Sequence, residues 1–351
     1  MKIIARDSNI TMGIDASTKT LSITVLQDGQ CVKHATVPYD RKALESFLKR
    51  FPECRIRSVY EASSIGYWLH DTLQELGVEN TVTPPSKTPR SSEDRVKTDR
   101  RDSLKLAQLH QARLLKAICV PSKEQRAARQ LLRTRKQLSG QRKRTMTQIR
   151  SLLLFHHIES PKGIGRPWTR SYLHWVASEP FSTVQGGAYL RESLDALLRI
   201  YHELSKQVLE LNKRIARMGA DSCYAAPVER LQSTPGIGVL TALTILTEIG
   251  SVERFATSQQ FTSYLGLTPS EHSSGNMQRQ GRITRAGNTH IRGLLVECCW
   301  MWIGKDQAAY RTYRRIPRRR EPKRAIVAMG RRLATRIYWQ LRKLQNQKAA
   351  G

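Results

Sequence analysis

Four carboxylates in the N-terminal third of the chain have the types and spacing that metal-assisted chemistry on a phosphodiester requires. Asp15 follows an apolar run and Glu61 ends another, while Asp99 and Asp102 begin a helical pattern. Their i, i+3 spacing puts Asp99 and Asp102 on one face of a helix, near its N-terminus. Four carboxylates brought together would repel one another unless they held divalent cations. Hard oxygen ligands select Mg²⁺ or Mn²⁺, and a metal pair can clamp a phosphodiester during displacement.

Each carboxylate also has an ordinary structural interpretation. Asp99 can cap the helix, Asp102 can form a salt bridge with an arginine, and Glu61 can be a solvated strand end. Taken singly, these interpretations are favoured. Taken together, on two strands and a helix in this order, the four residues favour a metal site.

The elements that must position these carboxylates form a predicted α/β domain over residues 8–120. Period-2 alternation and short apolar runs predict five strands, and helical spacing predicts helices between them. Strands first, followed by alternating helix and strand, indicate a mixed sheet with helices on its faces. The expected strands are Ile10–Asp15, Leu21–Leu26, Cys31–Val37, Ile56–Glu61 and Asn80–Thr83; the expected helices are Arg41–Phe51, Tyr67–Leu76 and one from Asp99 through Leu114.

Composition indicates a polyanionic partner. The chain has 351 residues, 39% of them hydrophobic, and a formal net charge of +30. This charge predicts nucleic-acid binding. No apolar run approaches the ~20 residues of a membrane span, and the N-terminus lacks the apolar core of a signal peptide. Six scattered cysteines without a Cys-x-x-Cys pair indicate neither zinc nor disulfides, so we expect a protein of the reducing cytoplasm.

The middle segment, residues 121–222, reads as two long helices. The first, Glu124 to about Phe155, is dense in arginine and lysine, and we expect it to lie along a nucleic-acid backbone. The second, Tyr189 to Met218, carries a 3,4 hydrophobic repeat typical of a coiled coil. That seam can pair with the basic helix of the same chain or with another subunit.

Residues 223–351 predict a small helical domain that opens on Ser233–Leu240, which contains Pro-Gly-Ile-Gly. Gly236 and Gly238 in a tight turn before a helix leave backbone N–H groups that suit a nucleic-acid phosphate; an ordinary helix-turn-helix corner is the alternative. The loop Gly266–Gly275 holds a Ser-Ser-Gly step that can present a hydroxyl. Basic clusters beyond it supply affinity rather than sequence specificity: Arg279, Arg282 and Arg285, then Arg318, Arg319 and Arg320.

The order of these motifs resembles a known family. Asp15, Glu61, Asp99 and Asp102 on strand, strand and helix resemble the RNase H-like fold of RuvC-type Holliday junction resolvases. More closely, Gly13-Ile-Asp15, Tyr60-Glu-Ala62 and Lys97-Thr-Asp-x-x-Asp102 look like the DEDD domain of the IS-one-ten family of insertion-sequence transposases. Four further motifs look like the C-terminal domain of that family: Pro235–Gly238, Tyr264–Pro269, Ser274-Gly275 and Arg285–Asn288.

The resemblance implies a mechanism. Ser274, or its neighbour Ser273, is the expected DNA nucleophile beside the four-carboxylate Mg²⁺ site, and it forms a transient phosphoserine. Arg282 and Arg285 would bind the phosphate oxygens. The resemblance further implies a structured guide RNA (a bridge RNA) from the element's non-coding end, and a dimer or tetramer whose subunits supply different halves of the site.

The sequence therefore predicts a transposase or DNA recombinase of an insertion sequence, with domains at 8–120, 121–222 and 223–351. Two alternatives remain. A metal-dependent junction resolvase or nuclease would use water as nucleophile and would not need Ser274. A non-catalytic nucleic-acid-binding protein would use the carboxylates only as scaffold.

Overall fold

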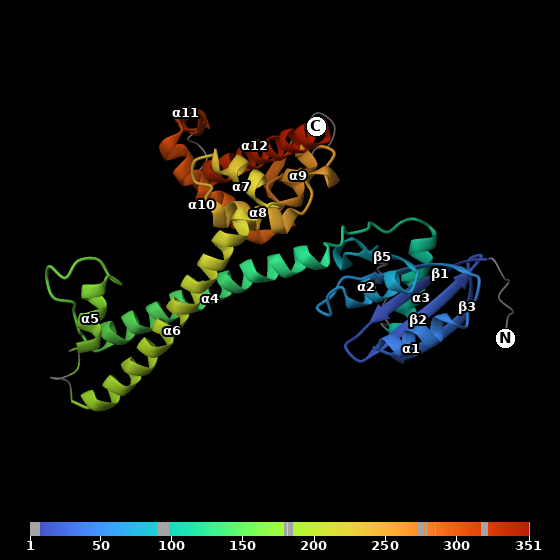
Figure 1. Ribbon diagram of the computed structural model, residues 1–351, viewed down its shortest axis with the longest axis horizontal. Coiled ribbons are helices and arrows are strands. Elements are labelled where there is room, and N and C mark those ends of the chain that lie inside the picture. The colour runs from blue at the N-terminus through green and yellow to red at the C-terminus, as the bar shows by residue number, and fades with distance from the viewer. Residues whose placement is uncertain are drawn as a thin grey trace. The chain divides into compact units, whose positions relative to one another are not determined.

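The computed structural model describes residues 8–89, 98–178, 181, 185–271, 277, 279–284, 286–316 and 322–350. The chain divides into two compact units, Met1–Pro121 and Ser122–Gly351. Figure 1 shows a mixed sheet with its helices in the first unit and helices almost throughout the second.

The first unit is built on a five-stranded sheet with strand order β3-β2-β1-β4-β5. β1 (Asn9–Ala16) pairs antiparallel with β2 (Thr20–Gln27), and β2 pairs antiparallel with β3 (Gln30–Pro38). On its other side β1 pairs parallel with β4 (Arg55–Glu61), which pairs parallel with β5 (Glu79–Thr83). β1 is therefore central, and its carboxyl end lies beside that of β4. A short 3₁₀ turn, η1 (Pro85–Lys87), follows β5.

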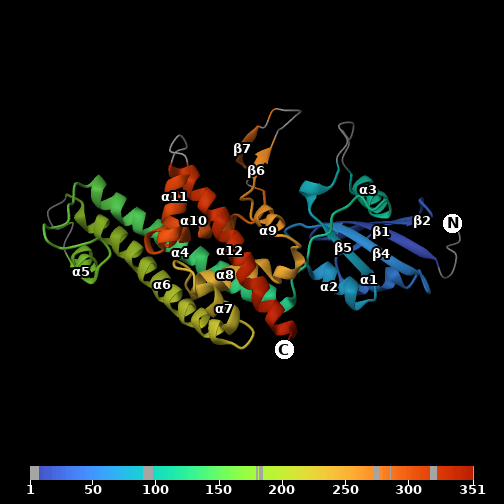
Figure 2. The ribbon, with the colours of Figure 1, turned by 90° about the horizontal axis from the view of Figure 1, so that it is seen from above.

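Helices cover both faces of this sheet, as Figure 2 shows. Ile10, Met12 and Ile14 alternate along β1, so they point to one face. There they join a buried cluster with side chains of α1 (Arg41–Leu48) and α2 (Trp68–Glu75). α3 (Asp99–Gln111) packs on the opposite face. The expected mixed sheet, covered on both faces, is confirmed.

A helical hairpin begins the second unit. α4 (Lys123–Phe155) and α6 (Gly187–Ala220) pack side by side, and α5 (Arg170–Ser178) closes one end in a shared apolar cluster. The predicted seam of α6 is buried at every seventh residue, at Leu194, Tyr201, Val208 and Ile215. The basic helix of the same chain thus contacts this seam, the intrachain alternative left open by the sequence.

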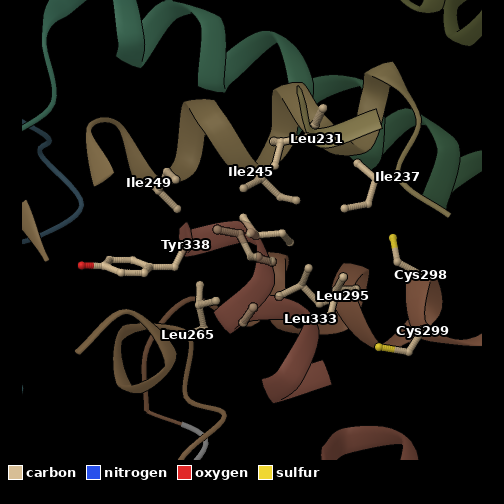
Figure 3. Packing of buried hydrophobic residues seen from close by; sticks show 14 of the residues in the cluster. Leu231, Ile237, Ile245, Ile249, Leu265, Leu295, Cys298, Cys299, Leu333 and Tyr338 are labelled. Atoms are coloured by element: carbon tan, nitrogen blue, oxygen red, sulfur yellow. The ribbon is translucent and has the colours of Figure 1, made fainter. Parts of the chain in front are cut away.

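The rest of the second unit forms one apolar core (Figure 3). Ile245 and Ile249 of α8 face Leu333 and Tyr338 of α12 across it. Its helices are α7 (Ala225–Gln232), α8 (Val239–Ile249), η2 (Val252–Arg254), α9 (Ser258–Tyr264), α10 (Thr289–Lys305), α11 (Gln307–Arg315) and α12 (Pro322–Ala350). Within the described ranges, no helix is long and apolar enough to cross a membrane.

Two expectations differ from the structure. The C-terminal domain is not purely helical, because β6 (Pro269–Glu271) and β7 (Gln280–Ile283) form an antiparallel pair. Its sequence lacks the apolar alternation that identifies strands, and backbone hydrogen bonds define the pair. The helix expected through Leu114 ends at Gln111, since Arg113 adopts a left-handed φ of 58°, which cannot continue an α-helix.

Candidate active site and nucleic-acid surface

Asp15 and Glu61 lie at the carboxyl ends of two neighbouring parallel strands. β1 and β4 pair in register up to Ile14 and Tyr60, so the two carboxylates follow at the next position. Residues at matching positions of adjacent strands point to the same face, and the strands lie about 4.8 Å apart. Asp15 and Glu61, both half-buried, therefore project side by side from one face of the sheet.

The face that bears Asp15 is the one that α3 covers. In the β1–β2 register Gly13 pairs with Thr24 and Asp15 pairs with Ser22. The Ser103 hydroxyl of α3 lies 2.8 Å from Thr24 Oγ1 and 3.4 Å from Ser22 Oγ. The helix thus passes over the sheet right beside Asp15.

Asp99 and Asp102 lie in the first turn of α3, on the N-terminal side of Ser103. Asp99 precedes Ser103 by four residues and so shares its face of the helix. Thr98 is the N-cap, because its Oγ1 accepts a hydrogen bond from the Arg101 backbone N–H at 3.3 Å. The interpretation of Asp99 as the cap is therefore wrong. The positive end of the helix dipole favours carboxylates in this turn.

The donor chemistry of these four residues fits a divalent cation, but their spacing is not that of a closed metal site. Carboxylate oxygens are the ligands that Mg²⁺ and Mn²⁺ prefer. Among the residues that the structure describes, which include all four carboxylates, no three His, Cys, Asp or Glu side chains form a group that could hold a metal ion. Binding a cation would require these side chains to draw closer together.

Gly13→Ala is expected to destabilise the first unit by roughly 2–3 kcal/mol, the cost of overfilling a packed interior. A Cβ here would lie 2.0 Å from the Ser103 backbone oxygen and 2.5 Å from the Ala107 backbone nitrogen, so α3 would have to move. Urea unfolding measures the loss. Gly140→Ala, on an open face of α4 with nothing within 4 Å, is the control and should not lower stability. A Gly13→Ala variant with the parental unfolding midpoint would contradict this close packing.

Ser274 and its neighbour Ser273 lie outside the described residues, as do Arg285, Arg318, Arg319 and Arg320. Residues 267–285 include Ser274, and we call this stretch the Ser274 segment. The residues that flank it on both sides are described, and their backbones are in close contact. A Cβ on Gly287, at φ 101°, would lie 2.0 Å from the Tyr264 backbone oxygen. A Cβ on Gly266, at φ 67°, would lie 2.1 Å from the Ala286 backbone oxygen. Only glycine permits both this φ and this approach.

Arg279 and Arg282 lie within this segment, on the C-terminal side of Ser274. Arg279 directly precedes β7 and Arg282 is part of β7, and both side chains are exposed. Their exposure in the Ser274 segment suits the predicted binding of a polyanion.

The two predicted phosphate-binding glycines have different surroundings in the turn between α7 and α8. Gly236 has a φ of 90°, and a Cβ there would lie 2.7 Å from the Cys298 backbone oxygen, so this glycine is needed for packing against α10. Gly238 is exposed, has nothing within 4 Å of a built Cβ and directly precedes α8. Only Gly238 therefore leaves room for a phosphate.

Several arginines of α4 contact protein groups, although Arg133 keeps 46% of its side chain exposed. Arg133 donates two hydrogen bonds to the Glu248 carboxylate, at 2.7 and 2.9 Å. Arg129 donates to the Thr247 and Glu248 backbone oxygens, and Arg135 donates to Asn212 Oδ1 at 2.9 Å. A buried acid from α8 thus compensates part of the charge that the sequence assigned to nucleic acid. Lys143, Arg144 and Arg150 remain exposed on α4.

Two family descriptions match parts of this chain. Residues 12–158, which include the four carboxylates, match a DEDD transposase domain. Residues 228–314, which include the Pro-Gly-Ile-Gly turn and Ser274, match the transposase IS116/IS110/IS902 family.

Several relatives align along much of the chain. The putative transposase y4qE of Sinorhizobium fredii is 33% identical over 75% of this chain and 62% of its own length. The probable family 20 transposase of Pseudomonas aeruginosa is 30% identical over 86% of this chain and 87% of its own length. The transposase for insertion sequence element IS1533 of Leptospira borgpetersenii is 24% identical over 97% of both chains.

Proposed function

Because the chain belongs to the IS116/IS110/IS902 family of transposases, we propose that it cleaves and exchanges the DNA strands of an insertion sequence with four carboxylates and a serine nucleophile. The observation that carries the proposal is the arrangement at the end of the sheet. Asp15 and Glu61 project side by side there, and the first turn of α3 brings Asp99 and Asp102 to the same face. A transposase acts on DNA, so the acidic site faces a phosphodiester substrate.

The four carboxylates would hold a divalent cation, Mg²⁺ or Mn²⁺, as the DEDD domain implies. When bound, the cation would supply Lewis-acid stabilisation of the charge that develops on the reacting phosphate. The chain's own contribution is to fix the ligands. β1 and β4 set the distance between Asp15 and Glu61, and the tight contact at Gly13 sets the height of α3 above them.

Ser274 would attack the scissile phosphate. Its Oγ forms a bond to phosphorus, the bond to one DNA oxygen breaks, and that oxygen leaves with the proton that the serine loses. The resulting phosphoserine keeps the energy of the broken linkage, so a DNA hydroxyl can later displace the serine without a high-energy cofactor. A free hydroxyl is a weak nucleophile, and it therefore needs electrostatic help from a bound cation or from arginines. Arg282 and Arg285 would provide it.

The remaining basic surface would hold the rest of the nucleic acid. Gly238 offers room for a phosphate before α8, and Arg279, Lys143, Arg144 and Arg150 are exposed for backbone contacts. Arg318, Arg319 and Arg320 would extend this surface. Sequence choice would come from a structured guide RNA that pairs with donor and target DNA, as in other RNA-guided systems. We further propose a dimer or tetramer in which carboxylates and serine come from different subunits.

A second candidate is a metal-dependent junction resolvase or nuclease. It is favoured by the fact that all four carboxylates lie in the first unit, Met1–Pro121, so this unit alone carries the proposed ligands. Water would then replace Ser274 as nucleophile, and no covalent intermediate would form.

A plasmid recombination assay tests the proposed function. We expect joined donor and target plasmids when the donor carries the element's ends together with its transcribed flanking non-coding DNA. Replacing that flank by an unrelated sequence of equal length should abolish the joined product, because the guide is lost. Cleavage of four-way junctions without any joined plasmid would instead support the resolvase candidate. Equal recombination with either flank would contradict RNA guidance.

A further inference from the structure

A buried carboxylate of α8 has no role in the proposed chemistry. The Glu248 side chain is only 2% exposed, in a helix whose other buried residues are apolar or threonine. An ionised acid in such a place is costly unless it is paired and hydrogen-bonded. A buried ion pair is weak evidence for stability, because apolar residues of similar volume often stabilise a core as well. The cost of burying the Glu248 carboxylate therefore indicates that this side chain serves to position other groups.

The Glu248 carboxylate binds two different elements at once. Arg133 of α4 donates to Oε1 at 2.7 Å and to Oε2 at 2.9 Å, and Asn288 Nδ2 donates to Oε2 at 2.8 Å. Burial pushes the pKa of Glu248 upward, but the hydrogen bonds from Arg133 and Asn288 and the charges of Arg133 and Arg129 outweigh it, so the pKa lies below its ordinary value. The side chain is thus an anion that joins α4 to the residue before α10.

Asn288 in turn fixes the start of α10 and the end of the Ser274 segment. Its Oδ1 accepts hydrogen bonds from the backbone N–H groups of His290 and Ile291, at 3.0 and 3.1 Å, which makes it the N-cap. Its own backbone N–H donates to the Tyr264 oxygen at 3.1 Å. The Tyr264 hydroxyl donates to the Glu248 backbone oxygen at 3.3 Å. Asn288 is therefore tied to both ends of the segment.

We infer that Glu248 is a positioning residue for strand cleavage: through Asn288, it fixes the base of the Ser274 segment against α4 and α8. This inference rests on the proposed function, in which Ser274 of that segment is the nucleophile. Small displacements of a reacting group cost large factors in rate. Loss of the Glu248–Asn288 contact should consequently slow attack more than it weakens DNA binding.

Exchanging donor and acceptor tests this contact. Asn288→Asp places two carboxylates against each other, and we expect the rate of covalent DNA attachment at saturating plasmid DNA to fall about tenfold or more. Glu248→Gln combined with Asn288→Asp restores the hydrogen bond between these two positions with its direction reversed and keeps a good N-cap. The amide that replaces Oε2 no longer accepts from Arg133 Nη2, so Arg133 keeps only its bond to Oε1. The double variant should therefore regain part of the rate that Asn288→Asp loses. Plasmid DNA carrying the element's ends, with its flanking transcript, is the probe.

Two further variants separate positioning from folding. Asn288→Ser keeps an oxygen for the N-cap but is too short to reach Glu248, so it should fold, bind DNA with the parental Kd and react more slowly. Gln125→Ala removes another α4–α8 contact, its 2.8 Å hydrogen bond to the Thr247 backbone oxygen, and should react at the parental rate. Unfolding midpoints are measured for all variants.

Parental attachment rates for both Asn288→Asp and Asn288→Ser would overturn the positioning role. So would a loss of rate that the double variant does not rescue, or one fully matched by loss of DNA affinity. Covalent attachment by Ser274→Ala would instead overturn the proposed nucleophile, so the two failures are distinguishable.

Discussion

The Asp15→Asn variant is expected to lose DNA strand cleavage by roughly a thousandfold, because a bound cation contributes several kcal/mol of transition-state stabilisation. Asparagine has the same shape as aspartate but lacks its charge, so it should weaken the proposed cation site without disturbing the sheet. Asp15 is half-buried at the end of β1, and the substitution should leave the apolar face of the strand unchanged.

Two measurements check this expectation. Nicking of a plasmid that carries the element's ends reports cleavage, and calorimetric titration with Mn²⁺ reports cation binding independently of activity. Asp28→Asn is the matched control: it removes one acidic charge from an exposed turn of the same unit, at a left-handed φ of 49° that asparagine tolerates. Parental cleavage or parental Mn²⁺ binding by Asp15→Asn would show that Asp15 is not a ligand.

The first unit could be predicted from the sequence in considerable detail. Its strands alternate between buried apolar residues and small or polar ones, and Ile10, Met12 and Ile14 against Thr11 and Gly13 are an example. Such local alternation specifies both the strand and its two faces. The placement of Asp15 and Glu61 at strand ends followed from the same pattern, whereas the pairing of β1 with β4 is known only from the structure.

Contacts between distant parts of the chain could not be predicted in this way. Gly13 allows α3 to approach β1 through atoms of Ser103 and Ala107, about ninety residues away in the sequence. The sequence around Gly13 gives no sign that a helix packs on it, and the sequence of α3 gives no sign that it packs on a glycine. Thr98 and Asp99 are both good N-cap residues, so only the backbone of the folded helix identifies Thr98 as the cap.

The arginines of α4 show the same limit in the second unit. Their shared charge predicted a polyanion along the helix, yet Arg133 pairs with Glu248, 115 residues later in the chain. The sequence around Glu248 does not identify Arg133 as its partner. It does show that Glu248 is the one acid in an otherwise apolar helix, and this feature could have indicated a buried ion pair, because a buried charge must be paired.

Ser274→Ala is expected to abolish covalent attachment of DNA and to reduce strand exchange by at least about a thousandfold, since no other group then holds the cleaved phosphate. The alanine lacks only the hydroxyl, so DNA binding and folding should remain parental. Ser273→Ala is the matched control on the adjacent residue and should form the adduct normally. Loss of the adduct in Ser273→Ala, with retention in Ser274→Ala, would transfer the role of nucleophile to Ser273.

The most direct test denatures the protein during the reaction and measures DNA that stays covalently attached to it. The proposed serine mechanism predicts attached DNA for the parent chain and none for Ser274→Ala or Asp15→Asn. Cleavage that persists in Ser274→Ala, stops in Asp15→Asn and leaves no DNA attached to the parent would contradict it. In that case the protein would be a metal-dependent nuclease that uses water.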